Sequence, residues 1–489
     1  MVIKLALGAL SLSLACASAL AQDAKTTIAD AQKALGNPTS ITYSGSAKDV
    51  SFQQCGANAT QMSCQGTHDP MRPITSYTRV IDLAAPATRH TGGTNNIGPG
   101  GSTAVTPGTF FQQVTPQQAD LSQPWAQSID LYLTPWGFLK GAEANNATAS
   151  RKRISGKQYT VLSWSPTVKA PSGKSYTING YVSDKNYVER VETWVGDNIM
   201  GDMHVLATYS GWKDFGGTTA PEKIVQTRGG WPFFQVDVAS AKANPTDLDS
   251  LAPAPANRPA GPPPGGPPAA MTVTTEKLGD GFWRLTTGAG SYDSLVIEFK
   301  SYIMMLEAGQ SVARASAYVA EAKKLAPNKP IRYVMNTHPH SDHTGGLPAL
   351  VAEGTTIVTQ RNNKVFLEGA LNTPRTLLDD VLAKNPKKAR IETVSEKKVY
   401  SDGTRTVELY HIYPAPHSNG LLVAYIPKEK VLFQGDFSVT PGQPANDHVK
   451  ALVPALEKLN LVDFDRYINV HAPAAPQTKA DVWKAVGKT

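Results

Sequence analysis

The chain has 489 residues, of which 41% are hydrophobic and 18% are charged, and its 47 basic and 40 acidic side chains give a formal net charge of +7. This length exceeds one ordinary hydrophobic core and predicts two domains joined by a linker. The charge excess is too mild for a nucleic-acid-binding surface, and no apolar run of eighteen residues follows the N-terminus, so neither nucleic acid nor stable membrane insertion is expected.

The first residues are typical of a secretory signal peptide. Lys4 precedes an apolar stretch from Leu5 to Ala17, and a small-x-small cleavage site ends at Ala21. We therefore assign residues 1–21 to the signal peptide and expect a periplasmic or secreted protein. Cys16 leaves a lipoprotein anchor open as an alternative to soluble export.

Residues 22–242 are predicted to form a β-rich N-terminal domain. Cys55 and Cys64 flank a polar loop and are expected to form a disulfide bond in an oxidising compartment. Short connectors between strand-like segments favour antiparallel hairpins. The meander from Gly180 to Val238 resembles the open half-barrel of periplasmic lipoprotein-carrier domains. The expected strands are 77–83, 159–164, 176–182, 188–195, 205–209 and 223–227.

Residues 243–270 are predicted to be a linker, because proline and glycine dominate the composition there. Proline removes backbone donors and holds the chain extended, so such a segment does not belong to a core. The domain boundary is placed here, and residues 271–489 form the second domain.

The second domain alternates strand-like and helix-like segments. Apolar positions at helical spacing predict a helix over 312–325. A helical insert is expected at 363–383 and a further helix at 449–459. The expected strands are 282–285, 294–299, 302–306, 331–335, 356–359, 407–412, 421–426, 431–433 and 467–470.

The segment from Asn336 to Gly346 concentrates three imidazoles and one carboxylate within six residues. Alternate side chains of an extended segment point the same way, so His338 and His340 can bind one ion. After the following turn, Asp342 and His343 can point at a neighbouring ion. The sequence therefore predicts a metal-binding loop, and two metals are consistent with it.

Three later candidate ligands, His417, Asp436 and His471, each follow or flank an apolar, β-like run. Layered α/β folds gather site residues at the ends of their strands. The HxHxDH loop, the later histidine, the aspartate after a glycine and the final histidine occur in the order typical of the metallo-β-lactamase superfamily. Residues 271–489 resemble that superfamily.

The resemblance implies an α/β fold with an αββα sandwich in the second domain, and a site for two zinc ions. One departure is that Glu307 stands where the family has an early aspartate, a position that orients the loop without binding metal. The implied ligands are His338, His340 and His417 for one zinc ion, Asp342, His343 and His471 for the second, and Asp436 bridging both.

Two zinc ions would make a bridging hydroxide available near neutral pH, with Asp342 both binding metal and handling the proton. The sequence thus predicts an exported dinuclear zinc hydrolase acting on a small ester, lactone, thioester or amide. One alternative is a mononuclear iron oxidoreductase of the same fold, similar to the superfamily's persulfide dioxygenases. The other is a periplasmic lipid-binding protein with an ancillary metal site. The prediction names neither the substrate nor an oligomeric state.

Overall fold

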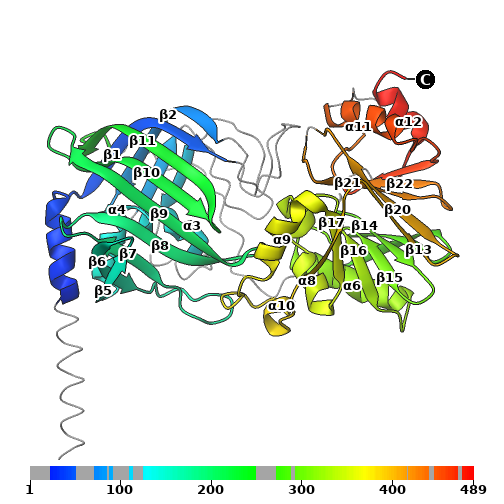
Figure 1. The fold of residues 1–489 in the computed structure, drawn as a ribbon. Helices are drawn as coiled ribbons and strands as arrows, with labels where there is room; N and C mark the ends of the chain where they lie inside the picture. The colour runs from blue at the N-terminus through cyan, green and yellow to red at the C-terminus, as the bar shows by residue number, and fades with distance from the viewer. Residues whose placement is uncertain are drawn as a thin grey trace, which may run out of the picture.

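The computed structural model describes residues 23–50, 71–84, 87–91, 109–113, 125–248, 271–287, 292–415, 417–439, 445, 447–471 and 476–488. The expected signal peptide, Cys55, Cys64 and most of the expected linker lie outside these residues. The described residues form two lobes that meet along one side (Figure 1). None of their helices is long and apolar enough to cross a membrane.

The N-terminal lobe is built on one 11-stranded sheet in the order β4-β3-β2-β1-β11-β10-β9-β8-β7-β6-β5. Every strand pairs with its neighbour in antiparallel fashion, so the prediction of a β-rich antiparallel domain is confirmed. The strands are β1 (Ser40–Asp49), β2 (Arg72–Asp82), β3 (Ala87–Thr91), β4 (Thr109–Gln113), β5 (Thr148–Ile154), β6 (Lys157–Trp164), β7 (Ile178–Val182), β8 (Val188–Asp197), β9 (Gly201–Asp214), β10 (Thr219–Arg228) and β11 (Trp231–Ala243).

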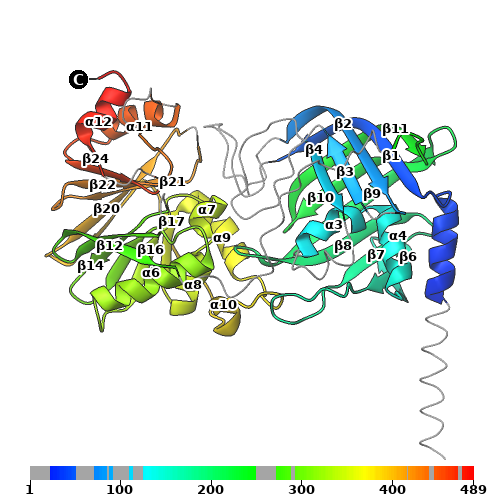
Figure 2. The same ribbon diagram turned by 180° about the vertical axis from the view of Figure 1, so that it is seen from behind.

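Helices that the sequence analysis did not anticipate pack on this lobe. Residues 23–34 are helical, and α3 (Trp125–Tyr132) and α4 (Pro135–Ala144) lie against one face of the sheet (Figure 2). Thr134 caps α4 by accepting a hydrogen bond from the Gly137 N–H at 3.1 Å. Trp125 and Phe138 are buried in the same cluster as the inward side chains of the strands.

The C-terminal lobe contains two sheets. One has seven strands in the order β12 to β18, and the other has six in the order β19 to β24. The first comprises β12 (Val273–Gly279), β13 (Phe282–Thr287), β14 (Ser294–Glu298), β15 (Ile303–Leu306), β16 (Ile331–Met335), β17 (Thr356–Gln360) and β18 (Arg390–Val394). The second comprises β19 (Lys397–Ser401), β20 (Thr406–Ile412), β21 (Leu421–Ile426), β22 (Val431–Gln434), β23 (Arg466–Asn469) and β24 (Gln477–Thr478).

The two sheets pack face to face, and helices cover their outer faces. Ile297 and Met304 of the first sheet share a buried cluster with Leu409 and Phe433 of the second. Helices α6 (Val312–Leu325) and α8 (Leu347–Glu353) cover the first sheet, and α11 (Asp447–Lys458) and α12 (Lys479–Ala485) cover the second (Figure 2). This is the predicted αββα sandwich.

The expected helical insert over 363–383 consists of short helical segments with a break between them. The chain forms a 3-10 turn, η1 (Arg361–Asn363), then α9 (Lys364–Leu371) and α10 (Val381–Lys384). The segment between the two helices contains Pro374, which cannot supply a helical N–H. The backbone N–H groups of Thr376 and Leu377 instead donate to the carboxylate of Asp202 in the N-terminal lobe, at 2.8 and 2.9 Å.

Candidate metal centre

The topology of the sandwich brings the candidate ligands to one edge. The loop after β16 carries His338 and His340, and the short helix α7 (Ser341–Thr344) carries the next two. Asp436 follows β22 and His471 follows β23, which is parallel to β22. Because β21 runs antiparallel to β22, the β20–β21 loop places His417 at the same edge. All seven predicted residues therefore lie together, in two groups that share Asp436.

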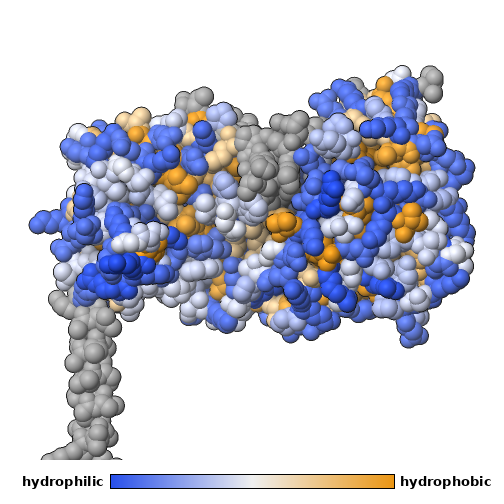
Figure 3. Space-filling view, viewed as in Figure 1, coloured by the Kyte–Doolittle hydropathy of each residue, from blue (hydrophilic) through white to orange (hydrophobic). Residues whose placement is uncertain are grey.

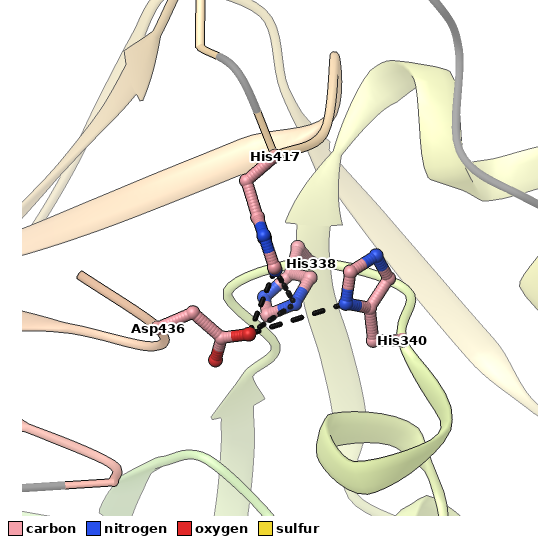
Figure 4. A group of neighbouring side chains, drawn as sticks. All are labelled: His338, His340, His417 and Asp436. Carbon is pink, nitrogen blue, oxygen red and sulfur yellow. Dashed lines mark hydrogen bonds and ion pairs between the residues drawn. The ribbon is translucent and has the colours of Figure 1, made fainter. Parts of the chain in front are cut away.

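The first group consists of His338, His340, His417 and Asp436 (Figure 4). The Nε2 atoms of His338 and His417 lie 3.0 Å apart. Both point at Asp436 Oδ2, at 3.5 and 2.7 Å respectively, and His340 Nδ1 lies 4.0 Å from the same oxygen. Three imidazole nitrogens thus converge on one carboxylate oxygen.

The second group consists of Asp342, His343, His471 and Asp436. The Nε2 atoms of His343 and His471 are 3.1 Å apart. They lie 3.3 and 3.1 Å from Asp342 Oδ2, and 2.5 and 3.0 Å from Asp436 Oδ1. Asp436 therefore presents one oxygen to each group, which is the arrangement that a bridging carboxylate needs.

Glycine before the shared carboxylate is a steric requirement. A Cβ atom on Gly435 would lie 2.6 Å from Thr337 Oγ1 and 3.3 Å from the ring of His338. Thr337 Oγ1 in turn lies 3.0 Å from His338 Nδ1, the nitrogen that faces away from the centre. This close packing fixes the ring so that Nε2 points inward.

Glu307 orients the loop that carries the first candidate ligands, as the resemblance implied. It is fully buried, and its Oε1 accepts a hydrogen bond from the Thr337 N–H at 2.6 Å. Its Oε2 lies 3.1 Å from Nδ1 of His343, so that ring also directs Nε2 into the centre. A carboxylate behind a histidine ligand is a common device for fixing its orientation and tautomer.

Two imidazoles of the first group, those of His338 and His340, are held in the neutral form. Burial, assisted by the neighbouring imidazole of His343, lowers the pKa of His338 to about 3. Burial and the nearby imidazoles likewise hold the pKa of His340 well below its usual value. Neutral rings have a lone pair available for a metal.

The second group behaves in the opposite way. Burial opposes protonation, yet the carboxylates of Asp436 and Asp342 hold the pKa of His343 well above its usual value. Burial also opposes protonation of His471, but hydrogen bonds to the same carboxylates raise its pKa to about 9. The two carboxylates therefore attract positive charge, which protons supply in the metal-free protein and which a cation would replace.

The donor set fits a transition-metal cation. Two nitrogens bound at about 2.0–2.1 Å to one tetrahedral zinc ion are roughly 3.3 Å apart. The Nε2 pair of His338 and His417 and that of His343 and His471 are each close to this distance. Imidazole and carboxylate donors suit zinc and also iron. The roles of the individual ligands remain those predicted from the sequence.

Three contacts at the centre were not anticipated. The ring of Tyr292 packs edge-on against His471, with centroids 4.8 Å apart, and the ring of His448 packs at 4.8 Å against His417. Asn469 accepts a hydrogen bond from the His471 N–H at 2.9 Å. No sequence motif includes His448, and its contact with His417 joins residues that are distant in sequence.

Comparisons with known proteins agree with this fold. Residues 287–477 match the sequence model of the metallo-beta-lactamase superfamily. The 2,4-dinitroanisole O-demethylase subunit alpha of Nocardioides sp. (strain JS1661) is 27% identical over 213 residues, which are 41% of this chain and 58% of that protein. The chain thus spans little more than half of that relative.

Solved structures of metallo-beta-lactamases are also similar. The enzyme from Hirschia baltica is 23% identical with a TM-score of 0.32, and covers 44% of this chain and 95% of its own. The enzyme from Pontibacter korlensis is 17% identical with a TM-score of 0.35, and covers 45% of this chain and 100% of its own.

Proposed function

We propose that this protein, whose C-terminal lobe has the metallo-β-lactamase fold, is a metal-dependent hydrolase. It would hold two divalent cations, zinc in the first instance. The observation that carries this proposal is the position of Asp436. Its Oδ2 lies 2.7 Å from His417 and its Oδ1 lies 3.0 Å from His471, so one carboxylate serves both donor groups. A mononuclear site would leave the second group without a role.

When bound, the metal supplies hydroxide near neutral pH and polarises the substrate oxygen. Asp342 Oδ2 lies between His343 and His471, where it can hold the proton released from water. Glu307 keeps His343 directed at the centre through its Nδ1 contact. The rings of His338 and His340 are fully buried, whereas the side chain of His471 keeps 24% of its exposure, so substrate approaches from the His471 side.

We propose an ester, lactone, thioester or amide as the substrate. The name of the O-demethylase relative favours a second candidate, cleavage of an aryl methyl ether. Hydrolysis of such an ether adds one water and releases a phenol and methanol. Oxidative cleavage, the iron-dependent alternative, consumes dioxygen with two electrons and two protons from an external reductant, and releases the phenol, formaldehyde and water.

The test is turnover of a substrate panel by the full-length protein loaded with zinc or with iron. The panel holds lactams, lactones, thioesters, amides, aryl esters, phosphodiesters and an aryl methyl ether. We expect the zinc-loaded protein to hydrolyse at least one carboxylic ester, lactone, thioester or amide without oxygen uptake. Chelation should abolish the rate and zinc should restore it. Turnover that requires iron and dioxygen would contradict the hydrolase. Failure of both forms, with lipid released on solvent extraction, would favour the lipid-binding alternative.

We also propose that the protein is exported to the periplasm or secreted. Residues 1–21 support this proposal through their basic start, apolar stretch and small-residue cleavage site. Mass spectrometry of the protein isolated from its host should give a mature chain that begins near Gln22, with Cys55 and Cys64 resistant to alkylation until reduced. An intact Met1 terminus would contradict export through cleavage at this site.

A further inference from the structure

Hydrogen bonds between Asp202 of the N-terminal lobe and the segment between α9 and α10 join the two lobes. The Asp202 N–H at the start of β9 donates to the carbonyl of Pro374 at 2.7 Å. The carboxylate of Asp202 accepts the N–H groups of Thr376 and Leu377 at 2.8 and 2.9 Å. Backbone of the α9–α10 segment is therefore fixed against the β8–β9 turn.

A cavity of about 450 Å³ lies at this junction, between α9 and the ends of β9 to β11. Its size falls in the range of small-molecule sites, which often form between domains. Hydrophobic residues reach the surface along this junction on the face viewed in Figure 3. The side chains that decide its chemistry are Met200, Met203, Trp231, Val365 and Phe366, with Gly369 leaving space in the wall.

The polar groups of the wall already have partners. The carboxylate of Asp202 is engaged by backbone N–H groups, and Nε2 of His204 lies 3.1 Å from the carboxylate of Glu192. The described residues that line the cavity include no lysine or arginine. An anionic ligand would meet Asp202 without a compensating cation, whereas methionine and aromatic side chains adapt well to neutral apolar surfaces.

The cavity also lies next to the helix whose N-terminal end contacts the loop that carries His417. Asn363, directly before α9, donates through Nδ2 to the carbonyl of Gly420 at 2.7 Å, in the loop that carries His417. With a rise of 1.5 Å per residue, Gly369 lies about 9 Å along the helix from Asn363. An occupant of the cavity would contact the same helix whose start holds the His417 loop.

We propose that this junction cavity is a second binding site, for a neutral aromatic or short-alkyl small molecule. It is separate from the metal centre, and its occupancy does not depend on the proposed hydrolase activity. The occupant packs its apolar surface between Met203, Trp231 and Phe366.

The test is titration of the full-length protein with neutral N-phenyl-1-naphthylamine. We expect saturable binding of one probe per chain, with energy transfer from tryptophan that falls in a Trp231→Phe variant. A Cβ atom on Gly369, which lines the cavity, would have no atom within 4 Å, so Gly369→Leu should occupy part of the cavity and weaken binding at least tenfold. Lys364→Leu adds the same side chain at an exposed position of α9 outside the cavity, and should change affinity less than twofold.

Two further measurements make the outcome decisive. His338→Ala should leave probe affinity unchanged, and loss of binding in that variant would place the probe at the metal centre and overturn the proposal. Val365 is 78% exposed, so Val365→Lys is tolerated at the surface and should also weaken binding by placing a charge at the cavity. Absence of saturable binding would refute the site. Wild-type probe affinity in both the Gly369→Leu and Val365→Lys variants, when these unfold at the wild-type temperature, would refute it as well.

Discussion

At the candidate metal centre, the carboxylates of Glu307 and Asp436 have different surroundings, which suit them to different tasks. Glu307 is fully buried behind the ligands and bonds to the Thr337 N–H and to His343. Asp436 lies among the imidazole nitrogens, where, despite burial, His343 and His338 hold its pKa well below the usual value. One carboxylate orients the ligands and the other is available to bind cations.

Glu307→Gln should weaken metal binding by about 10- to 100-fold, the range typical of a lost orienting partner. The amide can still accept a hydrogen bond from Thr337, but with that oxygen engaged its NH2 group faces Nδ1 of His343 and cannot accept a proton from it. Competition with a chelator of known affinity measures the effect. Glu298→Gln, at a partly exposed residue bonded to Lys329, is the matched control. Equal affinity of the Glu307 variant and wild type would contradict the orienting role.

Metal affinity should rise with pH. In the metal-free protein the pKa of His471 is raised to about 9, so its proton stabilises the fold fully below pH 6.5, and this contribution disappears as the pH rises through 9. A metal must displace that proton, which costs about tenfold in affinity for each pH unit below 9. Titrations at pH 6.5, 7.5 and 8.5 check the slope, and an affinity independent of pH would contradict this protonation.

At the same scale, sequence reasoning located the seven candidate ligands but not their neighbours. The ligands form an ordered pattern at the ends of strand-like runs, and such a pattern is visible in one dimension. Tyr292, His448 and Asn469 belong to no pattern, since their contacts arise only when separate loops fold over the edge of the sandwich. Tyr292 also adopts a positive φ of 79°, which its local sequence does not predict.

Among the elements, those with one clear period were predicted well. The helix over Val312–Leu325 and the strand over Ile331–Met335 have the expected bounds. The helices α3 and α4 were missed because residues 22–242 as a whole are predicted to be β-rich. Thr134-Pro135, an N-cap followed by proline in the first turn, was the signal that could have revealed α4.

The break between α9 and α10 depends on the other lobe. Asp202→Ala removes the acceptor for the N–H groups of Thr376 and Leu377, a loss of about 0.5–1.5 kcal/mol for each hydrogen bond. Hydrogen exchange of these two amides should accelerate by about tenfold or more. Asp184→Ala, at an exposed turn of the same lobe, should leave their exchange unchanged. Unchanged exchange in the Asp202 variant would show that other contacts hold the segment.

At the scale of the whole molecule, length and composition predicted two domains. The periodicity of apolar residues predicted a β-rich first domain and an α/β second domain. The contacts between the lobes were beyond that reasoning, because they join residues far apart in sequence, such as Asp202 and Leu377. Buried apolar residues of both lobes form one continuous cluster, which includes Met203, Phe366 and Leu377. The lobes are thus packed together through the insert that adjoins the metal centre.

A fragment of residues 271–489 should fold and keep the metal content of the full chain, because all seven candidate ligands lie within it. Its thermal unfolding temperature should fall, since Phe366 and Leu377 lose part of the cluster that buries them. Elemental analysis and calorimetry measure both quantities. A folded fragment without metal would contradict the assignment of the centre to this domain.

The measurement that tests the account most directly is metal per chain, determined beside turnover for wild type and Asp436→Ala. The wild type should hold two cations. The variant loses the only carboxylate shared by both groups but keeps His338, His340 and His417, so it should hold about one. Its rate should fall by about two to four orders of magnitude, as expected when a nucleophile is no longer positioned and activated. A variant with two tightly bound metals and full activity would contradict the bridging role and the dinuclear mechanism with it.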